Sequence, residues 1–234
     1  MTRAPGATLH FGTGEPVTLV LVRHGVTTMT DSGAYSGSST PGPPLTETGR
    51  AQVARAARLV ARVGDDVWTD VEPPSSVLAS PMVRTQGTGQ VLADALGLAL
   101  GTDARLAECD FGDWEGRTAE EVEDAWPGLL RRWHQEGTVA APGGESMADV
   151  GRRVGGLLRE LAATHAGRTV VLATHAVVLR SVVGSSVGLD PGRWYTLRVP
   201  PASVSAVRLW QDGHAELTAL GIMDALAGPA ALRP

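Results

Sequence analysis

The sequence predicts an α/β fold in which a mostly parallel central sheet lies between two layers of helices. Short apolar runs rich in β-branched residues, at residues 17–22 and 169–174, have the pattern of buried strands. Longer amphipathic segments separate them. Strands that alternate with helices in this way are typical of a three-layer α/β/α sandwich. We see no internal repeat, and we expect one domain at residues 17–225, after a flexible leader at 1–16 and before a C-terminal tail at 226–234.

The first half of the chain contains start signals for two helices and one long loop. Thr46 is a helix N-cap, and Ser80 and Pro81 are typical of an N-cap and a first helical turn. Residues 31–44 are dense in Ser, Gly and Pro, and a loop of this length in a compact domain is usually functional or disordered. We therefore expect strands at residues 17–22 and 76–79 and helices at residues 46–63 and 80–96.

The second half carries the same kind of signals. Thr118 and Glu121 form a capping-box pattern, Ser146 is an N-cap, and Gly167 can end a helix. The residues Gln211-Asp212-Gly213 separate two apolar runs, as in a hairpin. We expect strands at residues 98–100 and 169–174, helices at residues 118–126, 129–135, 146–164 and 177–187, and a closing hairpin at residues 203–209 and 215–220.

Two histidines follow the two most apolar strands. Arg23 and His24 end the first, and His175 directly follows the strand at 169–174. The carboxyl ends of parallel strands lie at one edge of a sheet, where ligands of α/β proteins bind. A fixed cation beside two imidazoles there indicates an anion site with a potential nucleophile. A single histidine at a strand end is more often structural, and the pair of histidines makes the ligand-facing interpretation equally compatible with the sequence.

Composition limits how this anion can be held. The chain has 234 residues and a net charge of −5, so it has no general positive field for nucleic acid. It contains no lysine and no asparagine, and all 20 basic residues are arginine. Phosphate must therefore be held by arginine, histidine, hydroxyls and backbone amides. No two histidines have metal-ligand spacing, so we expect no metal and no cofactor.

Targeting and redox signals point to the cytoplasm. The first residues lack the apolar region of a signal peptide, and no apolar stretch is long enough to span a membrane. Cys109 is the only cysteine, so no intramolecular disulfide exists. We expect a cytoplasmic protein with a small-molecule partner, and no membrane or nucleic-acid partner.

Three further motifs join the histidines. They are Leu45-Thr46-Glu47-Thr48-Gly49, Ser80-Pro81-Met82-Val83-Arg84, and Leu106-Ala107-Glu108 followed by Trp114-Glu115-Gly116. In this order and spacing, the chain resembles the histidine phosphatase superfamily, which has the phosphoglycerate-mutase-like fold. The resemblance runs from about residue 19 to residue 175 and, more loosely, to the hairpin.

The resemblance implies a role for each group. His24 would attack phosphorus and form a phosphohistidine, Arg23 and Arg84 would bind the phosphoryl oxygens, and His175 would stabilise the transferred group. Glu108 would protonate the leaving alkoxide and then activate water. Its acidic neighbours Asp110, Asp113 and Glu115 compete for that role, with Glu115 more typical of a structural position.

Thr27, Thr30 and Gly37 are further candidates for substrate binding. Thr27 can offer its hydroxyl or its amide to phosphate. Thr30 departs from the family pattern, because similar proteins usually have Asn there. Ala176 also departs, since a glycine commonly follows the second histidine. Both departures bear on pocket geometry, and neither removes a catalytic group.

The function that we expect is hydrolysis of a phosphomonoester. The segment after Glu108 resembles the phosphatase branch, which includes acid and α-ribazole phosphatases. A bisphosphoglycerate-dependent mutase and a non-catalytic phosphate-binding scaffold remain alternatives. The mutase is disfavoured because the lysines that mutases use are absent, and the scaffold because all five core groups are present. We expect residues 31–44 and 118–142 to roof the pocket, with the tryptophans of the second segment packing in the core.

Overall fold

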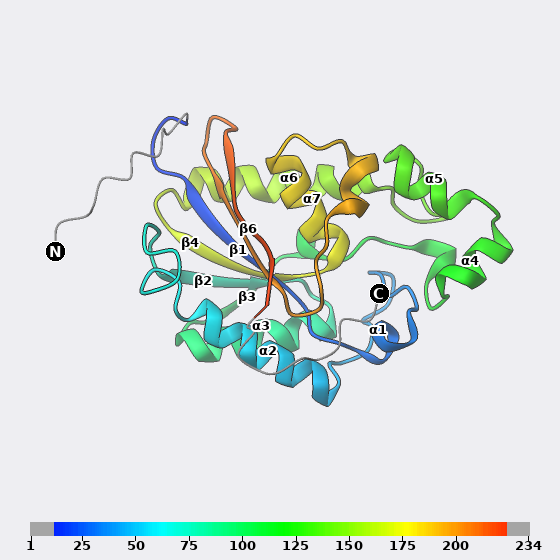
Figure 1. The fold of residues 1–234 in the computed structure, drawn as a ribbon, viewed down its shortest axis with the longest axis horizontal. Helices are drawn as coiled ribbons and strands as arrows, with labels where there is room; N and C mark the ends of the chain where they lie inside the picture. The colour runs from blue at the N-terminus through cyan, green and yellow to red at the C-terminus, as the bar shows by residue number, and fades with distance from the viewer. Residues whose placement is uncertain (1–11, 224–234) are drawn as a thin grey trace.

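A single six-stranded sheet organises the chain. The computed structural model describes residues 12–223 (Figure 1). The strand order is β3-β2-β4-β1-β5-β6. The strands are β1 (Val17–Arg23), β2 (Pro74–Ala79), β3 (Leu100–Thr102), β4 (Thr169–Thr174), β5 (Val204–Leu209) and β6 (Ala215–Ile222). The first four strands in this order pair in parallel, whereas β5 and β6 are antiparallel. The predicted mostly parallel α/β sheet is therefore confirmed.

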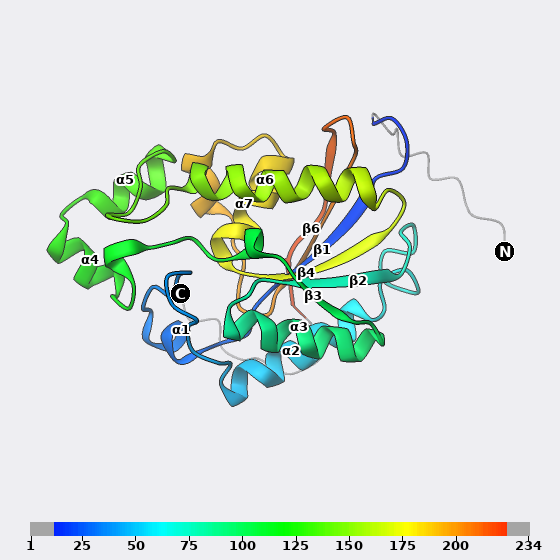
Figure 2. The same ribbon diagram turned by 180° about the vertical axis from the view of Figure 1, so that it is seen from behind.

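Helices cover both faces of this sheet. The longer ones are α2 (Glu47–Val60), α3 (Val83–Leu96), α6 (Met147–Thr164) and α7 (Ala176–Ser186). Figures 1 and 2 show α2 and α3 on one face and α6 and α7 on the other. The short helices are α1 (Thr28–Ser32), α4 (Ala119–Ala125) and α5 (Leu129–Glu136), with 3-10 turns η1 (Ala104–Leu106), η2 (Gly112–Trp114) and η3 (Pro191–Thr196). Both views place α4 and α5 beyond the carboxyl ends of the parallel strands.

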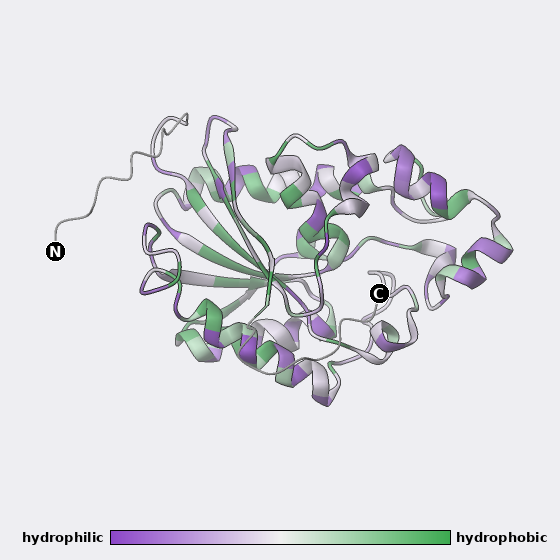
Figure 3. Cartoon of the chain, viewed as in Figure 1, coloured by the Kyte–Doolittle hydropathy of each residue, from purple (hydrophilic) through white to green (hydrophobic). Residues whose placement is uncertain are grey.

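The central strands are apolar on both faces, as parallel strands under two helix layers must be. Leu19 and Leu21 of β1 pack in the cluster beneath α6 and α7, whereas Val20 and Val22 pack in the cluster beneath α2 and α3. Figure 3 shows this hydrophobic character along the strands. Successive side chains of β1 thus point alternately into the two hydrophobic cores. This packing holds the carboxyl end of β1 rigidly between them.

Three local predictions were wrong. The helix expected from Ser80 begins at Val83 with Met82 as N-cap. The Ser80 hydroxyl accepts from the amide of Met82 at 3.4 Å and lies 2.8 Å from Nε2 of the distant His175. The short strand lies at Leu100–Thr102 rather than residues 98–100, where it pairs with β2. The loop after β1 contains the unpredicted helix α1, which a capping box between Thr27 and Thr30 starts.

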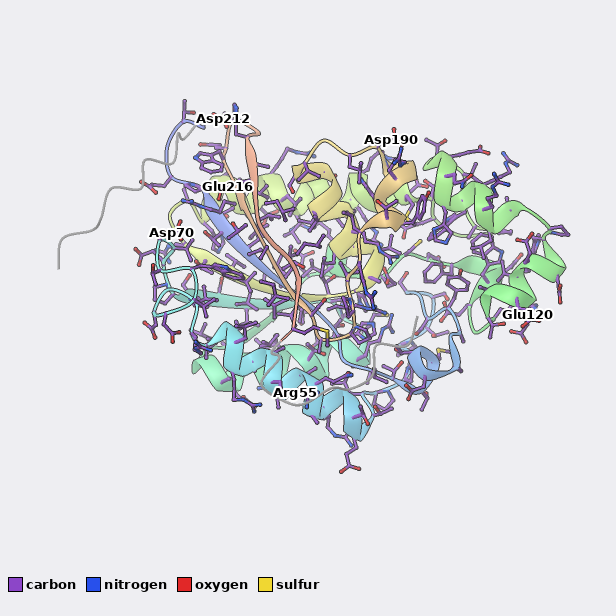
Figure 4. The ribbon with its side chains drawn as sticks, in the orientation of Figure 1. Arg55, Asp70, Glu120, Asp190, Asp212 and Glu216 are labelled. Carbon is purple, nitrogen blue, oxygen red and sulfur yellow. The ribbon has the colours of Figure 1, made fainter. Side chains whose placement is uncertain are left out.

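The described part of the leader is tied to the C-terminal hairpin. The amide of Thr13 donates to Asp212 Oδ2 at 2.8 Å, and Trp210 Nε1 donates to the carbonyl of Gly14 at 3.1 Å. Figure 4 shows Asp212 at the tip of the β5–β6 hairpin. Residues 1–11 of the expected leader, and the whole expected tail at 226–234, lie outside the described residues. Within residues 12–223, no helix has the length and apolar character to cross a membrane.

Candidate active site

A pocket of about 760 Å³, including space open to solvent, lies at the carboxyl edge of the sheet. Its floor comes from β1 and the start of α7, and its walls come from the segment around α1, from the residues after Glu108 and from α5. Part of each segment that we expected to roof the pocket does line it: residues 33–36 of the first segment and residues 133–134 of the second. The lining residues with ionisable or hydroxyl side chains are Arg23, His24, Thr27, Thr30, Tyr35, Ser36, Glu108, His134 and Arg180.

His24 is held in one ring orientation at the end of β1. Its Nδ1 lies 2.8 Å from the carbonyl oxygen of Gly25, which can only accept. The proton of the neutral ring is therefore on Nδ1, and Nε2 keeps its lone pair. Burial, with the charges of Arg23 and Arg84, holds the pKa of His24 well below its usual value. The imidazole is therefore neutral and nucleophilic at physiological pH.

His175 faces His24 from the neighbouring strand. The two ring centroids are 5.2 Å apart and the rings are edge-to-face. His175 Nε2 lies 2.8 Å from Ser80 Oγ, while its buried Nδ1 has no hydrogen-bond partner among the described residues. Burial and the charge of Arg84 lower the pKa of His175 well below its usual value. If Nε2 accepts the Ser80 proton, Nδ1–H becomes a buried donor free for a ligand.

Arg23 is fixed from behind by the chain that precedes β5. Its Nη1 donates to the carbonyl of Val199 at 2.8 Å, and its buried Nε has no partner among the described residues. Burial lowers the pKa of Arg23 to about 10, although Glu108 raises it. The guanidinium stays charged and keeps donor capacity toward an anion in the pocket.

Arg84 is fully buried on α3 beneath the loop that follows α1. Its Nη2 donates to the carbonyls of Ser36 and Gly37 at 2.8 and 3.2 Å. Its Nε and Nη1 have no partner among the described residues, and burial lowers its pKa. Gly42, at φ +73°, passes so close that a Cβ there would collide with Nη1 of Arg84. The loop therefore packs directly on the guanidinium.

Glu115 holds that loop in place. Its Oε2 accepts from the amide of Gly37 at 2.7 Å, on the same residue whose carbonyl accepts from Arg84. This contact gives Glu115 a structural position, as the sequence suggested. The hydrogen bond to Glu115 also occupies the Gly37 amide. Ser36 lines the pocket, whereas Gly37, which we expected to bind substrate, does not.

The Glu108 carboxylate lies at the N-terminus of α7, where backbone amides point at it. Oε1 accepts from the amides of Cys109 at 2.9 Å and Val177 at 3.3 Å, and Oε2 accepts from Val177 at 3.4 Å. The side chain is 5% exposed and lines the pocket beside His24. Of the four acidic candidates, Asp110, Asp113 and Glu115 are not among the lining residues.

An ion pair between Arg153 on α6 and Glu145, which precedes that helix, fixes the backbone of Glu108. Arg153 donates to the carbonyls of Glu108 at 2.9 Å and Arg105 at 2.8 Å. It also forms a bidentate pair with Glu145, whose Oε2 accepts from the amide of Asp110 at 2.9 Å. Residues 105–110 are thus clamped on both sides of Glu108. Sequence reasoning did not find this pair, because no motif links residues 145 and 153.

Thr27 and Thr30 line the pocket while they bond to each other. The Thr27 hydroxyl accepts from the amide of Thr30 at 3.2 Å, and the Thr30 hydroxyl accepts from the amide of Thr27 at 3.3 Å. The hydroxyl that replaces the family's Asn at position 30 therefore serves to cap α1.

Two lining residues were missed by sequence reasoning. Arg180 lies four residues after Ala176 and three after Val177, so the three share one face of α7. That spacing after His175 was the available signal. His134, which matches no motif in the sequence, lines the pocket and packs edge-to-face against Trp133 with ring centroids 4.8 Å apart. Trp133 is buried in the core, as expected for the tryptophans of this segment.

The donor set of this site is suited to an anion. Within residues 12–223, no group of three or more His, Cys, Asp or Glu side chains is arranged to hold a metal ion. Arg23 and Arg84 instead have buried guanidinium N–H groups without a partner among the described residues, and the charges of both act on His24. Charge-assisted donors of this kind match the oxygens of a phosphoryl group.

Known proteins share both the sequence and the fold. Residues 19–222 match the model of the histidine phosphatase superfamily (branch 1). Phosphoserine phosphatase 1 of Hydrogenobacter thermophilus is 33% identical over 82% of this chain and 87% of its own. A protein of Yersinia enterocolitica named probable phosphoglycerate mutase GpmB is 33% identical over 80% of this chain and 82% of its own.

A solved structure agrees with these relatives. Mycobacterial glucosyl-3-phosphoglycerate phosphatase, in complex with VO3, superposes with a TM-score of 0.77 at 27% identity, over 87% of this chain and 98% of that one. The chain spans about half, 52%, of the length of 36% identical proteins from Mycobacterium, one of which is named a bifunctional protein. The match over residues 19–222, with the fold and the paired histidines, shows that the chain belongs to the histidine phosphatase superfamily.

Proposed function

We propose that this chain hydrolyses phosphomonoesters through a phosphohistidine on His24. The orientation of His24 carries the proposal. With Nδ1–H donated to the carbonyl of Gly25, the unprotonated Nε2 is the atom available to phosphorus. Family membership and the phosphatase names of the relatives support the same reaction.

In the first half-reaction, Nε2 of His24 attacks phosphorus and the bond from phosphorus to the ester oxygen breaks. Glu108, in its protonated form, gives its proton to the leaving oxygen, so an alcohol departs. The Nδ1–H contact with Gly25 then stabilises the positive charge on the phosphorylated ring. Glu108 is left as a carboxylate among the amides at the N-terminus of α7.

In the second half-reaction, the Glu108 carboxylate removes a proton from water, and the water oxygen attacks phosphorus. The bond between phosphorus and Nε2 breaks, inorganic phosphate leaves, and His24 is neutral again. Arg23, Arg84 and His175 neutralise the phosphoryl oxygens throughout. These groups supply the charge that a metal supplies in other phosphatases, so we propose a reaction that needs no metal and no cofactor.

Trapping of the intermediate tests this proposal. Labelled substrate quenched at high pH, in the presence of EDTA, should leave label on His24 of the wild type. His24→Ala should show no label and no turnover, because no other group in the pocket can replace Nε2. Wild-type turnover by the alanine variant would disprove the covalent mechanism.

The same assay separates the alternatives. A mutase primed with bisphosphoglycerate would move phosphate between monophosphoglycerates faster than it releases inorganic phosphate. A non-catalytic scaffold would bind phosphate without label on His24. We also propose that the hydrolase acts on a small phosphorylated substrate in the cytoplasm.

A further inference from the structure

The pocket extends beyond the groups that we assign to the chemistry. Its outer wall is formed by Arg180 on α7, His134 on α5 and Tyr35 on the loop after α1. Arg180 lies near enough to Glu108, Tyr35 and His134 for their charges to affect one another. These side chains line the same pocket as Glu108, which would protonate the leaving oxygen, so we place the leaving group against this wall.

Arg180 is held in place but lacks an ionic partner. Its Nε donates to the carbonyl of Leu197 at 3.0 Å, which fixes the plane of the guanidinium. None of the ion pairs among residues 12–223 includes it. Burial lowers its pKa, and Glu108 only offsets this in part. The two Nη atoms are left for a ligand in the pocket.

His134 adds an unpartnered polar atom to this wall. Its Nδ1 is buried and has no hydrogen-bond partner among the described residues. Burial and Arg180 lower the pKa of His134 to about 4, so the ring is neutral at physiological pH. A neutral ring beside a guanidinium leaves the outer wall with one net positive charge.

In the proposed complex of enzyme and substrate, no protein group balances the positive charge of Arg180. A phosphoryl dianion is matched by Arg23 and Arg84, and Glu108 must carry its proton, and so be neutral, to act as the acid. Arg180 then needs an anion that none of the protein groups in the pocket supplies. Arg180 is half-buried, and a cation that is partly removed from water gains from an anionic partner. The planar fork of arginine fits a carboxylate in a bidentate pair.

We infer that the alcohol part of the substrate carries a carboxylate that pairs with Arg180. The inference rests on the proposed hydrolase function and narrows its substrate class to phosphate esters of small hydroxy acids. A carboxylate, with one negative charge, matches the single positive charge of the outer wall. A second phosphate group carries two negative charges, which is more than the single positive charge of this wall.

A matched substrate pair tests the inference. O-phosphoserine and O-phosphoethanolamine differ only by the carboxylate, and 3-phosphoglycerate and glycerol 3-phosphate form a second pair. The wild type should prefer the carboxylate member of each pair by about 10–100-fold in kcat/KM, the value of one charge-assisted pair. Arg180→Met should remove this preference, while Arg180→Lys keeps part of it.

The controls distinguish this inference from the proposed function. Arg55 on α2 lies away from the pocket (Figure 4), so Arg55→Met should keep both the activity and the preference. If the wild type hydrolyses p-nitrophenyl phosphate but treats both members of each pair alike, the inference fails and the hydrolase stands. If it hydrolyses no ester, the proposed function fails.

Two further results would also overturn the role of Arg180. One is a preference that survives in Arg180→Met. The other is a stronger preference for a sugar bisphosphate over the matching monophosphate, which would assign Arg180 to a second phosphate. If Arg180→Met does not fold, the Lys and Gln variants and product inhibition of the wild type replace it. Serine and glycerate should then inhibit more strongly than ethanolamine and glycerol.

Discussion

At the scale of single residues, the two histidines of the site have different hydrogen-bond partners. His24 gives its Nδ1 proton to a carbonyl, which leaves a lone pair on Nε2. His175 has Nε2 against the Ser80 hydroxyl, and its Nδ1 can donate to a ligand when Nε2 accepts the hydroxyl proton. We therefore propose that the same side chain acts as a nucleophile at position 24 and as a hydrogen-bond donor at position 175.

Glu108→Gln should reveal the acid through its dependence on the leaving group. Alkyl phosphates leave as strongly basic alkoxides, so they should lose about 10²–10⁴-fold in kcat/KM. p-Nitrophenyl phosphate departs without a proton and should lose much less. Steady-state kinetics on both substrates measures the difference.

Asp110→Asn, Asp113→Asn and Glu115→Gln are the matched controls for Glu108. They should lack the leaving-group dependence, although Glu115→Gln should reduce stability because Glu115 anchors the amide of Gly37. The discriminating pattern at Asp113, or equal losses on both substrates at Glu108, would assign the acid elsewhere.

At the scale of elements, helix α6 acts on the site without reaching it. Arg153 and Glu145 hold the carbonyl of Glu108 and the amide of Asp110. Neither residue lines the pocket. Their effect on the reaction must therefore pass through the position of Glu108, which makes Arg153 a positioning residue.

Arg153→Met should reproduce part of the Glu108→Gln phenotype. We expect a larger loss of kcat on alkyl phosphates than on p-nitrophenyl phosphate, since a displaced acid chiefly affects the basic leaving group. In a Glu108→Gln background the same change should cost little more on alkyl phosphates, and a double-mutant cycle measures this. Losses that simply add, on both substrates alike, would mean that Arg153 only stabilises the fold.

At the scale of the molecule, buried histidines link stability to pH. The pKa values of His24 and His175 in the fold lie below their usual value of 6.5. Between that value and the folded values the unfolded chain binds more protons, so stability is full above pH 6.5 and falls as the pH drops below it.

This linkage predicts the outcome of chemical denaturation between pH 8 and pH 5. The free energy of unfolding should fall below pH 6.5 by up to about 1.4 kcal/mol per pH unit for each histidine. His134, whose pKa is lowered to about 4, adds to the same decline. His24→Gln should have a shallower decline than the wild type, because one of these three histidines no longer titrates. If the free energy of unfolding falls equally steeply in both proteins, the pKa of His24 is the same in the folded and the unfolded chain.

The sequence predicted the sheet and the site edge for a physical reason. Residues 17–22 and 169–174 are apolar without interruption, so their burial, and the position of His24 and His175 after them, followed from local pattern. The structure brings the two histidine rings together, with centroids 5.2 Å apart, and His24 lines one pocket with Arg23 and Glu108.

The parts that the sequence did not predict depend on tertiary contacts. Ser80 has the local pattern of an N-cap, yet its hydroxyl turns to His175, 95 residues away. Arg180 sits in an apolar helix, and only the packing of α7 decides that its face lines the pocket. The single turn of α1 lies in a polar loop, where one capping box is too short a signal.

The carbonyls behind the two pocket arginines belong to one late segment of the chain. Val199 holds Arg23 and Leu197 holds Arg180, while the amide of Ala202 donates to the carbonyl of His24 at 3.1 Å. Residues 1–190 therefore contain every side chain that we assign to the reaction, but none of these anchors. A fragment that stops before residue 197 would keep the reacting groups and lose the carbonyls that fix both arginines.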